Sequence, residues 1–174
     1  DSRSKVLILM GDAPLVQRDT LNSLISTESD LAVLTVDTPD PFNYGRIVRQ
    51  TDRIKEIVEE KDASEEQKAI KEVNTGIMVC NSKRLISWLD LLTDDNAQKE
   101  LLLTDIVRFA NKDGSIVKAC KTNDIIEVTG VNTFSQLANL EKAFQRKKAQ
   151  ELMNQGLQVM DPERIDIRGT LKVG

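Results

Sequence analysis

The sequence predicts an α/β domain with a mostly parallel sheet and a small antiparallel insertion. Continuous apolar runs at residues 5–10, 31–36 and 73–80 are typical of strands that are buried on both faces. Helical segments separate these runs, and strands that alternate with helices favour a parallel sheet. In residues 46–49 and 53–58 polar and apolar residues alternate, which predicts a short antiparallel hairpin inserted into that sheet.

Turn and capping signals bound the elements of the first half. Apolar residues at helical spacing predict a helix over roughly residues 18–28. The loop DTPDPFNYGR, residues 37–46, is rich in Asp, Pro, Asn and Gly, which favour turns. Ser64 and Gln67 form a capping-box pattern that starts a short helix.

The second half begins with a helix that we expect Ser82 to cap. Its apolar face is predicted from residues spaced three and four apart, namely Leu85, Ile86, Leu89 and Leu92. Thr104 or a neighbour caps the next helix, and Gly114 ends it. Short strands are expected at residues 115–120 and 125–128.

A long helix is predicted to close the domain. Thr133 and Gln136 form a second capping box, and the helix runs to about Gln155 with Gly156 as its stop. Its apolar face is expected to consist of Leu137, Leu140, Phe144 and Leu152. In the last segment, MDPERIDIRGTLKVG, apolar residues alternate after a Pro turn, which indicates the start of another β element.

Composition excludes several classes of function. The net charge is -4 and aromatic residues make up 3% of the chain, so neither a basic patch nor a set of stacking aromatics favours nucleic-acid binding. No apolar run approaches the roughly 20 residues of a membrane helix, and no signal pattern opens the chain. Cys80 and Cys120 lie in apolar runs without metal-ligand spacing, which predicts buried, reduced thiols and a cytoplasmic protein. Without histidine, histidine triads are excluded.

Three polar residues lie in or at the ends of predicted apolar strands. Asp12 follows the first strand, at the carboxyl end where ligands bind in such sheets. It is either a turn former or a metal ligand. Asn74 enters a buried strand and needs hydrogen-bond partners, either in a loop that it pins or in a ligand. Asn132 precedes a capping box, which favours a role at the start of the helix.

Three further candidates have simple structural explanations. Glu59 ends the hairpin and by default is a solvated charge. Gly45 follows an aromatic residue, where a glycine either makes the turn or lets the backbone approach a ligand. Thr104 needs no ligand if it caps a helix.

Taken in order, the motifs resemble one family along nearly the whole chain. They are LMGDAPL, DPFNYGRIVR, IVEEKDAS-EQ, EVNTGIMV, WLDLL…NAQ, LTDI, EVTGVN…QLANLEKAFQ and DPERIDIRGTL. The sequence resembles the uridylyltransferase domain of bacterial bifunctional N-acetylglucosamine-1-phosphate uridylyltransferase/glucosamine-1-phosphate acetyltransferase. The resemblance implies a Rossmann-like nucleotide-sugar pyrophosphorylase domain. Such a domain joins UTP and N-acetylglucosamine 1-phosphate into UDP-N-acetylglucosamine, a cell-wall precursor, and releases pyrophosphate with Mg²⁺.

The resemblance also assigns roles to the candidates. It implies that Asp12 and Asn132 hold Mg²⁺, which prefers oxygen ligands and fills its remaining positions with phosphate and water. It implies that Gly45, Glu59 and Asn74 bind the N-acetylglucosamine part. Thr104 matches a further position of the substrate pocket. No protein nucleophile is needed, because the sugar phosphate itself attacks the α-phosphorus of UTP.

The resemblance further implies domain limits. Residues 1–160 correspond to the C-terminal two-thirds of the uridylyltransferase domain, and residues 161–174 to a linker and the start of a left-handed β-helix domain. The family's Gly-rich phosphate loop, which would precede residue 1, has no counterpart here. We therefore expect residues 1–174 alone not to release pyrophosphate. The family is a homotrimer through its β-helix.

Two aromatic positions of the family are changed. Met10 stands where the family has an aromatic residue before Gly-Asp, and Leu102 replaces a tyrosine of the sugar pocket. Neither side chain offers a phenol hydroxyl. These differences leave two alternatives open: a related enzyme for another sugar phosphate, or a non-catalytic remnant that serves as a structural platform.

Overall fold

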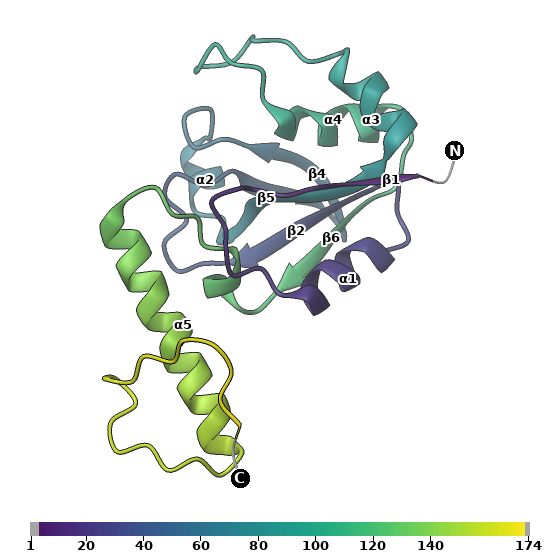
Figure 1. The fold of residues 1–174 in the computed structure, drawn as a ribbon. Helices are drawn as coiled ribbons and strands as arrows, with labels where there is room; N and C mark the ends of the chain where they lie inside the picture. Colours follow the sequence, from purple (N-terminus) through teal and green to yellow (C-terminus); the bar gives the residue numbers. More distant parts are fainter. Residues whose placement is uncertain (1–3, 173–174) are drawn as a thin grey trace.

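The computed structural model describes residues 4–172 and contains one mixed sheet with helices on both faces (Figure 1). The strands are β1 (Lys5–Ile8), β2 (Leu31–Asp37), β3 (Arg46–Gln50), β4 (Arg53–Val58), β5 (Glu72–Asn81) and β6 (Val117–Thr122). The α-helices are α1 (Arg18–Ser26), α2 (Glu65–Lys68), α3 (Ser82–Leu89), α4 (Ile106–Lys112) and α5 (Phe134–Asn154). Two 3-10 helices, η1 (Leu103–Asp105) and η2 (Ile125–Val128), complete the set.

The sheet has the order β4-β3-β5-β2-β6, and β1 also pairs with β5. The α/β class is confirmed, but the expectation of a mostly parallel sheet is wrong. Within the described residues, β2 and β6 form the one parallel pair, and the other pairings are antiparallel. An apolar run indicates that a strand is buried on both faces, but it does not indicate whether the strand runs parallel or antiparallel to its neighbours. The strand β5 runs against its neighbours, and its sequence could not reveal this.

One edge of β5 is shared by two strands. β2 occupies the other edge, from Leu31 opposite Cys80 to Asp37 opposite Glu72. On the shared edge, β1 ends with Ile8 opposite Met78, and β3 begins with Arg46 opposite Val73. Residues 74–77 of β5 therefore lie between the two partners, where the sheet edge opens.

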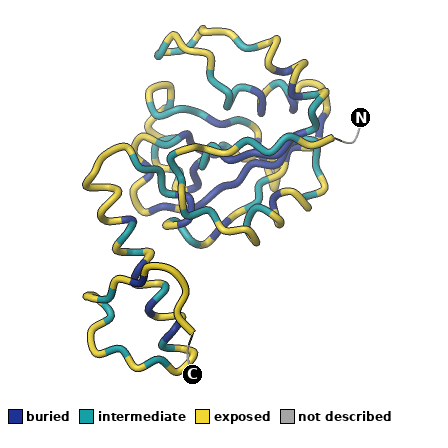
Figure 2. The backbone as a smooth tube through the Cα atoms, in the orientation of Figure 1, coloured by how far each residue is buried: buried dark blue, intermediate teal, exposed yellow. Residues whose placement is uncertain are grey.

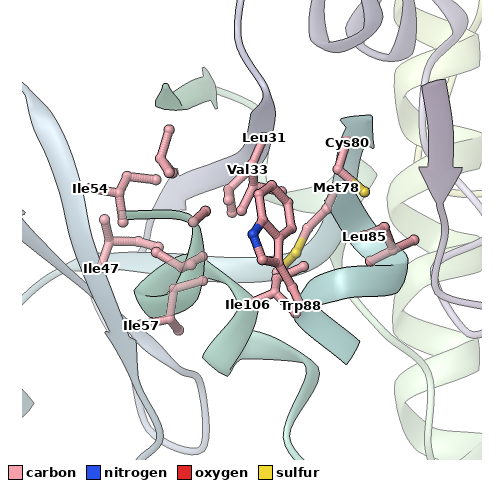
Figure 3. Packing of buried hydrophobic residues seen from close by; sticks show 13 residues of the cluster. Leu31, Val33, Ile47, Ile54, Ile57, Met78, Cys80, Leu85, Trp88 and Ile106 are labelled. Atoms are coloured by element: carbon pink, nitrogen blue, oxygen red, sulfur yellow. The ribbon is translucent and has the colours of Figure 1, made fainter. Parts of the chain in front are cut away.

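The core has two parts, one on each face of the sheet. The larger part lies between the sheet and helices α3 and α4 and is built around Trp88 and Met78 (Figure 3). The smaller part lies on the face covered by α1, whose Leu24 is fully buried. Buried backbone in Figure 2 is concentrated in the central strands.

The predicted apolar face of α3 is partly wrong. Leu85 and Trp88 are buried, whereas Ile86 is 63% exposed and Leu89 is 40% exposed. The helix is short and turns its Leu85–Trp88 pair toward the sheet, so the two other apolar residues face solvent. The cap is also shifted by one residue, because the Asn81 side chain accepts hydrogen bonds from the backbone N–H groups of Lys83 and Arg84.

The strand expected at residues 125–128 is instead the 3-10 helix η2. The Asp124 side chain accepts a hydrogen bond from the backbone N–H of Ile126 and starts this turn, which a short apolar run does not distinguish from a strand. The preceding strand begins two residues later than expected, at Val117. The hairpin and the helix at Ser64 are confirmed, the latter with both hydrogen bonds of its capping box.

Helix α5 projects away from the sheet, and the chain after it folds back along its C-terminal half (Figure 1). Its capping box at Thr133 is confirmed, and Gly156, with φ +104°, follows its end. The Gln145 side chain accepts a hydrogen bond from the Ile167 backbone N–H at 2.8 Å, which ties the returning segment to the helix.

The predicted face of α5 is only half right. Leu140 and Leu152 are buried, whereas Leu137 and Phe144 are exposed, and Gln145 and Ala149 complete the buried face instead. Described residues 161–172 contain no strand, and the domain boundary stays a prediction. Among residues 4–172, no helix is long and apolar enough to cross a membrane.

The two thiols should differ in reactivity. Burial raises the pKa of Cys80 to about 11, and burial also raises the pKa of the half-buried Cys120. At pH 8 the Cys80 thiol is then ionised to about one part in a thousand and is also shielded. We expect iodoacetamide to label Cys120 first in the folded protein and Cys80 only on unfolding, as measured by mass spectrometry.

The Cys120→Ser variant provides the control. It should take up label in urea but not under native conditions. Native labelling of Cys80 at the rate of a free thiol would contradict the burial described.

Candidate functional site

A cavity of about 460 Å³ lies where β1 and β3 part along the edge of β5. Five of the six sequence-predicted site residues line it: Asp12, Gly45, Glu59, Asn74 and Asn132. They come from the turn after β1, the two ends of the hairpin, the β5 edge and the loop before α5. The structure thus brings together residues that are up to 120 positions apart in the sequence.

The Asp12 turn lies directly against the loop before α5. The Val131 backbone N–H donates a hydrogen bond to the Asp12 carbonyl oxygen at 3.0 Å. A Cβ atom on Gly130 would fall 2.8 Å from Asp12 Oδ2, so a larger residue there would make this carboxylate shift. The close approach fixes Asp12 beside the residues that lead to Asn132.

The donor set at this point fits Mg²⁺. Within residues 4–172, neither the Asp12 carboxylate nor the Asn132 side-chain amide has a hydrogen-bond or ion-pair partner. The start of α5 uses only the backbone of Asn132, whose N–H donates to Gln136 Oε1 at 2.8 Å. Both side chains line the same cavity and carry oxygen atoms, the type of ligand that Mg²⁺ prefers.

The Glu59 carboxylate is held on two sides. Thr104 Oγ1 donates a hydrogen bond to Glu59 Oε1 at 2.9 Å, while Oε2 has no partner within residues 4–172. A Cβ atom on Gly45 would lie 3.2 and 3.3 Å from the two oxygens and 2.8 Å from Ile57 Cγ2. Gly45 therefore packs against Glu59, and the free oxygen is left for a ligand hydroxyl.

Thr104 acts in the structure through Glu59. It does not line the cavity and instead borders an adjoining depression of about 210 Å³, together with Glu59 and Leu102. Thr104 is not the cap of α4: the N-cap position is its neighbour Asp105, and no side chain makes a capping hydrogen bond there. The Thr104 hydroxyl is instead used to orient the carboxylate.

The Asn74 side chain uses only one of its two polar groups in the fold. Its Oδ1 accepts a hydrogen bond from the Gly76 backbone N–H at 3.1 Å, and its backbone N–H donates to the Gly45 carbonyl at 2.8 Å. The side-chain NH₂ has no partner within residues 4–172. Both readings of this residue are therefore compatible: it pins the loop with its oxygen and keeps a donor for a ligand.

Met10, where the family has an aromatic residue, packs over the β5 edge. A Cβ atom on Gly76 would fall 2.8 Å from both Cγ and Sδ of Met10. Gly76 also has φ +80°, a conformation that costs other residues free energy. The methionine thus covers one wall of the cavity by close packing on a glycine.

Sequence reasoning missed a buried ion pair behind the site. Arg46 is 2% exposed, and its guanidinium donates hydrogen bonds to Glu60 and to the Tyr44 carbonyl. Its Nε has no hydrogen-bond partner within the described residues. Arg46 and Glu60 directly follow Gly45 and Glu59, so the pair clamps the two hairpin ends that line the cavity. Nothing in the sequence distinguished this arginine from its exposed neighbours.

Solved structures show the class of fold. The chain superposes on a protein described as a glucose-1-phosphate thymidylyltransferase from Bacillus anthracis with a TM-score of 0.55 and 20% identity, over 91% of this chain and 58% of that one. It also superposes on the inositol-1-phosphate CTP transferase from T. maritima with a TM-score of 0.51 and 19% identity, over 78% of this chain and 54% of that one. The chain therefore has the fold of sugar-phosphate nucleotidyltransferases.

Sequence relatives are more specific. The chain is 50% identical over 171 residues to the bifunctional protein GlmU of Pseudoalteromonas atlantica and 48% identical over 176 residues to that of Pseudomonas aeruginosa. These alignments cover 97% and 99% of this chain but only 38% and 39% of the relatives. No protein-family model matches the chain. The chain is similar along almost its whole length to one segment of GlmU, which confirms the resemblance found from its motifs.

The Arg46–Glu60 pair should carry a large share of local stability. The Arg46→Met substitution leaves Glu60 without its buried partner, and we expect it to lower the free energy of unfolding by about 3 kcal/mol in urea denaturation. The Arg46→Met/Glu60→Leu double substitution should recover much of this loss, because it removes both charges.

The matched control is Arg53→Met, on the exposed start of β4. It should change stability by less than about 0.5 kcal/mol. Equal effects of the two single arginine substitutions would contradict the importance of the buried pair.

Gly76 and Gly114 form a matched pair for the packing of Met10. Their φ values are +80° and +79°, but a Cβ atom meets Met10 at Gly76 and nothing within 4 Å at Gly114. Each alanine substitution should cost about 1–2 kcal/mol for the backbone conformation. Gly76→Ala should lose about 1 kcal/mol more, for overpacking.

Urea denaturation measures both losses. In the Met10→Ala background the extra loss of stability at Gly76 should disappear. Gly76→Ala and Gly114→Ala should then lower the free energy of unfolding by the same amount. Identical losses for Gly76→Ala and Gly114→Ala would show that Met10 does not pack as described.

Proposed function

We propose that this chain forms the metal and sugar-phosphate side of a uridylyltransferase site that makes UDP-N-acetylglucosamine from UTP and N-acetylglucosamine 1-phosphate. The observation that carries the proposal is the single cavity lined by Asp12, Gly45, Glu59, Asn74 and Asn132. The similarity to GlmU proteins supports the choice of reaction. The chain spans 38–39% of the length of those relatives, so the activity of the whole GlmU protein is a proposal for this chain.

In the proposed reaction, a phosphate oxygen of the sugar phosphate forms a bond to the α-phosphorus of UTP. The bond from that phosphorus to the bridging oxygen of pyrophosphate breaks, and pyrophosphate leaves. No protein group becomes covalently attached. The residues of this chain therefore act by binding and orienting the two phosphates in line.

Two groups of lining residues divide this work. Asp12 and Asn132 would hold Mg²⁺, which supplies neutralising charge to the phosphates. The free Glu59 oxygen would accept a hydrogen bond from a sugar hydroxyl, and the free Asn74 NH₂ would donate one to the sugar part. The Gly45 N–H, which has no partner within residues 4–172, supplies a backbone contact.

The proposal also includes a homotrimeric full-length protein in the cytoplasm, as expected from the sequence. A related enzyme for another sugar phosphate is favoured by one observation, the absence of aromatic side chains at Met10 and Leu102, which line the cavity and the adjoining depression. A panel of sugar 1-phosphates separates the two. Stronger binding of glucose 1-phosphate than of its N-acetylated analogue would favour the alternative.

Isothermal titration of the chain with N-acetylglucosamine 1-phosphate, and with UDP-N-acetylglucosamine in the presence and absence of Mg²⁺, tests the proposal. Glu59→Gln should weaken sugar-phosphate binding about tenfold, because a hydrogen bond to a charged group is lost. Asp12→Asn should abolish the gain in UDP-N-acetylglucosamine affinity that Mg²⁺ provides and leave sugar-phosphate binding without metal unchanged.

Asp52→Asn, in the exposed turn of the hairpin, is the control and should change neither affinity. If Asp12→Asn and Asp52→Asn respond to Mg²⁺ alike, the metal role of Asp12 is wrong. If Glu59→Gln binds the sugar phosphate as the unsubstituted chain does, the sugar role of Glu59 is wrong.

A further inference from the structure

Glu127 is a buried carboxylate to which neither the resemblance nor the proposed reaction assigns a role. It lies in η2, is 3% exposed, and forms no ion pair with a lysine or arginine among residues 4–172. A buried charge without a cation is stable only when hydrogen-bond donors satisfy it. The donors of Glu127 therefore indicate what the residue holds in place.

These donors come from two separate segments. Thr20 Oγ1 lies 2.8 Å from Glu127 Oε2 and 3.0 Å from Oε1, and the Gln17 backbone N–H donates to Oε2 at 3.2 Å. Both belong to the start of α1. On its other side, Glu127 accepts a hydrogen bond from the hydroxyl of Thr122, the last residue of β6. The carboxylate thus joins the start of α1 to the end of the edge strand.

The two segments that Glu127 joins lead to the two residues of the metal pair. Asp12 lies in the turn just before α1, and Asn132 lies in the loop that follows η2. Those segments then meet at the Val131–Asp12 hydrogen bond of 3.0 Å and at the close approach of Asp12 to Gly130. The segment that contains Asp12 and the segment that contains Asn132 are therefore connected twice, once through Glu127 and once through the Val131–Asp12 hydrogen bond.

We propose that Glu127 is the positioning residue that holds the Asp12 turn against residues 130–132 and so sets the spacing of the metal ligands. The part of this inference that concerns metal rests on the proposed function. The part that concerns the position of Asp12 does not, because it is a property of the folded chain alone.

The substitution Glu127→Gln separates this role from simple packing. The side chain keeps its shape, but every described partner of Glu127 is a donor, and an amide has only one accepting oxygen. Its NH₂ group must then donate to the hydroxyl oxygen of Thr20 or Thr122, which reverses a hydrogen bond that the carboxylate accepts in the native chain. Thr20→Val removes the hydroxyl bonds from α1 and leaves the carboxylate, the Gln17 N–H bond and Thr122 in place.

Amide hydrogen exchange measured by NMR tests the position of Asp12 without any metal. The Val131 N–H is protected by the Asp12 carbonyl, and the Asn74 N–H in β5 is protected by the Gly45 carbonyl. In Glu127→Gln and in Thr20→Val, exchange at Val131 should accelerate about tenfold or more, with Asn74 changed less than about twofold. Equal acceleration at both amides, or none at Val131, would overturn the positioning role.

Binding of Mn²⁺, followed by electron paramagnetic resonance with UDP-N-acetylglucosamine present, tests the link to the metal. Glu127→Gln should weaken Mn²⁺ binding about tenfold, because the Asp12 turn is then held less firmly beside Asn132. The affinity for N-acetylglucosamine 1-phosphate without metal should stay within about twofold. The control is Asp113→Asn, which removes a carboxylate that accepts from Trp88 and Ser115 outside the cavity.

The two measurements distinguish the failure of each idea. If Val131 responds but the unsubstituted chain shows no Asp12-dependent Mn²⁺ binding, the proposed function fails and the positioning role stands. If Mn²⁺ binding depends on Asp12 but Glu127→Gln leaves it unchanged, the inference about metal spacing is wrong. If Asp113→Asn weakens Mn²⁺ binding as much as Glu127→Gln does, the effect is a general loss of stability and the inference is also wrong.

Discussion

The arrangement of the site depends on how β5 is paired. This strand has a continuous partner on one edge, β2, and two partners in succession on the other, β1 and β3. Backbone groups in a sheet need partners, so a strand edge that is left open between two partners must be covered by loops or left to a ligand. At residues 74–77 the turn after β1 and the segment before β3 do this covering, and the cavity lies between them.

Buried polar contacts then fix the loops that surround this opening. Arg46 with Glu60 clamps the hairpin ends, and Glu127 connects α1 to the loop before α5. A third cluster spans the neighbouring strands β3, β5 and β2, where Thr35 and Arg49 donate hydrogen bonds to Glu72. Burial alone would raise the pKa of Glu72, but these donors together hold that pKa below its usual value. Each cluster lies within a few residues of a position that lines the cavity.

The sequence predicted what is encoded locally. Capping boxes at Ser64 and Thr133 were recognised because the cap and its partner are three residues apart. The direction of β5 and the outward position of Ile86 depend on contacts between distant segments, which periodicity does not record. Residues 125–128 form a 3-10 helix and not the expected strand, because a segment of four mainly apolar residues fits both conformations.

The candidate site shows the same division. Asp12, Glu59 and Asn74 could be singled out because polar residues at strand ends need an explanation, but only the resemblance linked Asp12 to Asn132. The residues that reasoning from sequence missed are charged side chains that are buried, Arg46 and Glu127. Since charged residues are exposed in most cases, a sequence gives no reason to place them inside. Their partners explain their burial. Each charge lies where hydrogen-bonding groups from two segments meet, so it is satisfied only when those two segments are correctly aligned. A site built on loops around an open sheet edge needs such alignment, because the sheet itself does not supply it there.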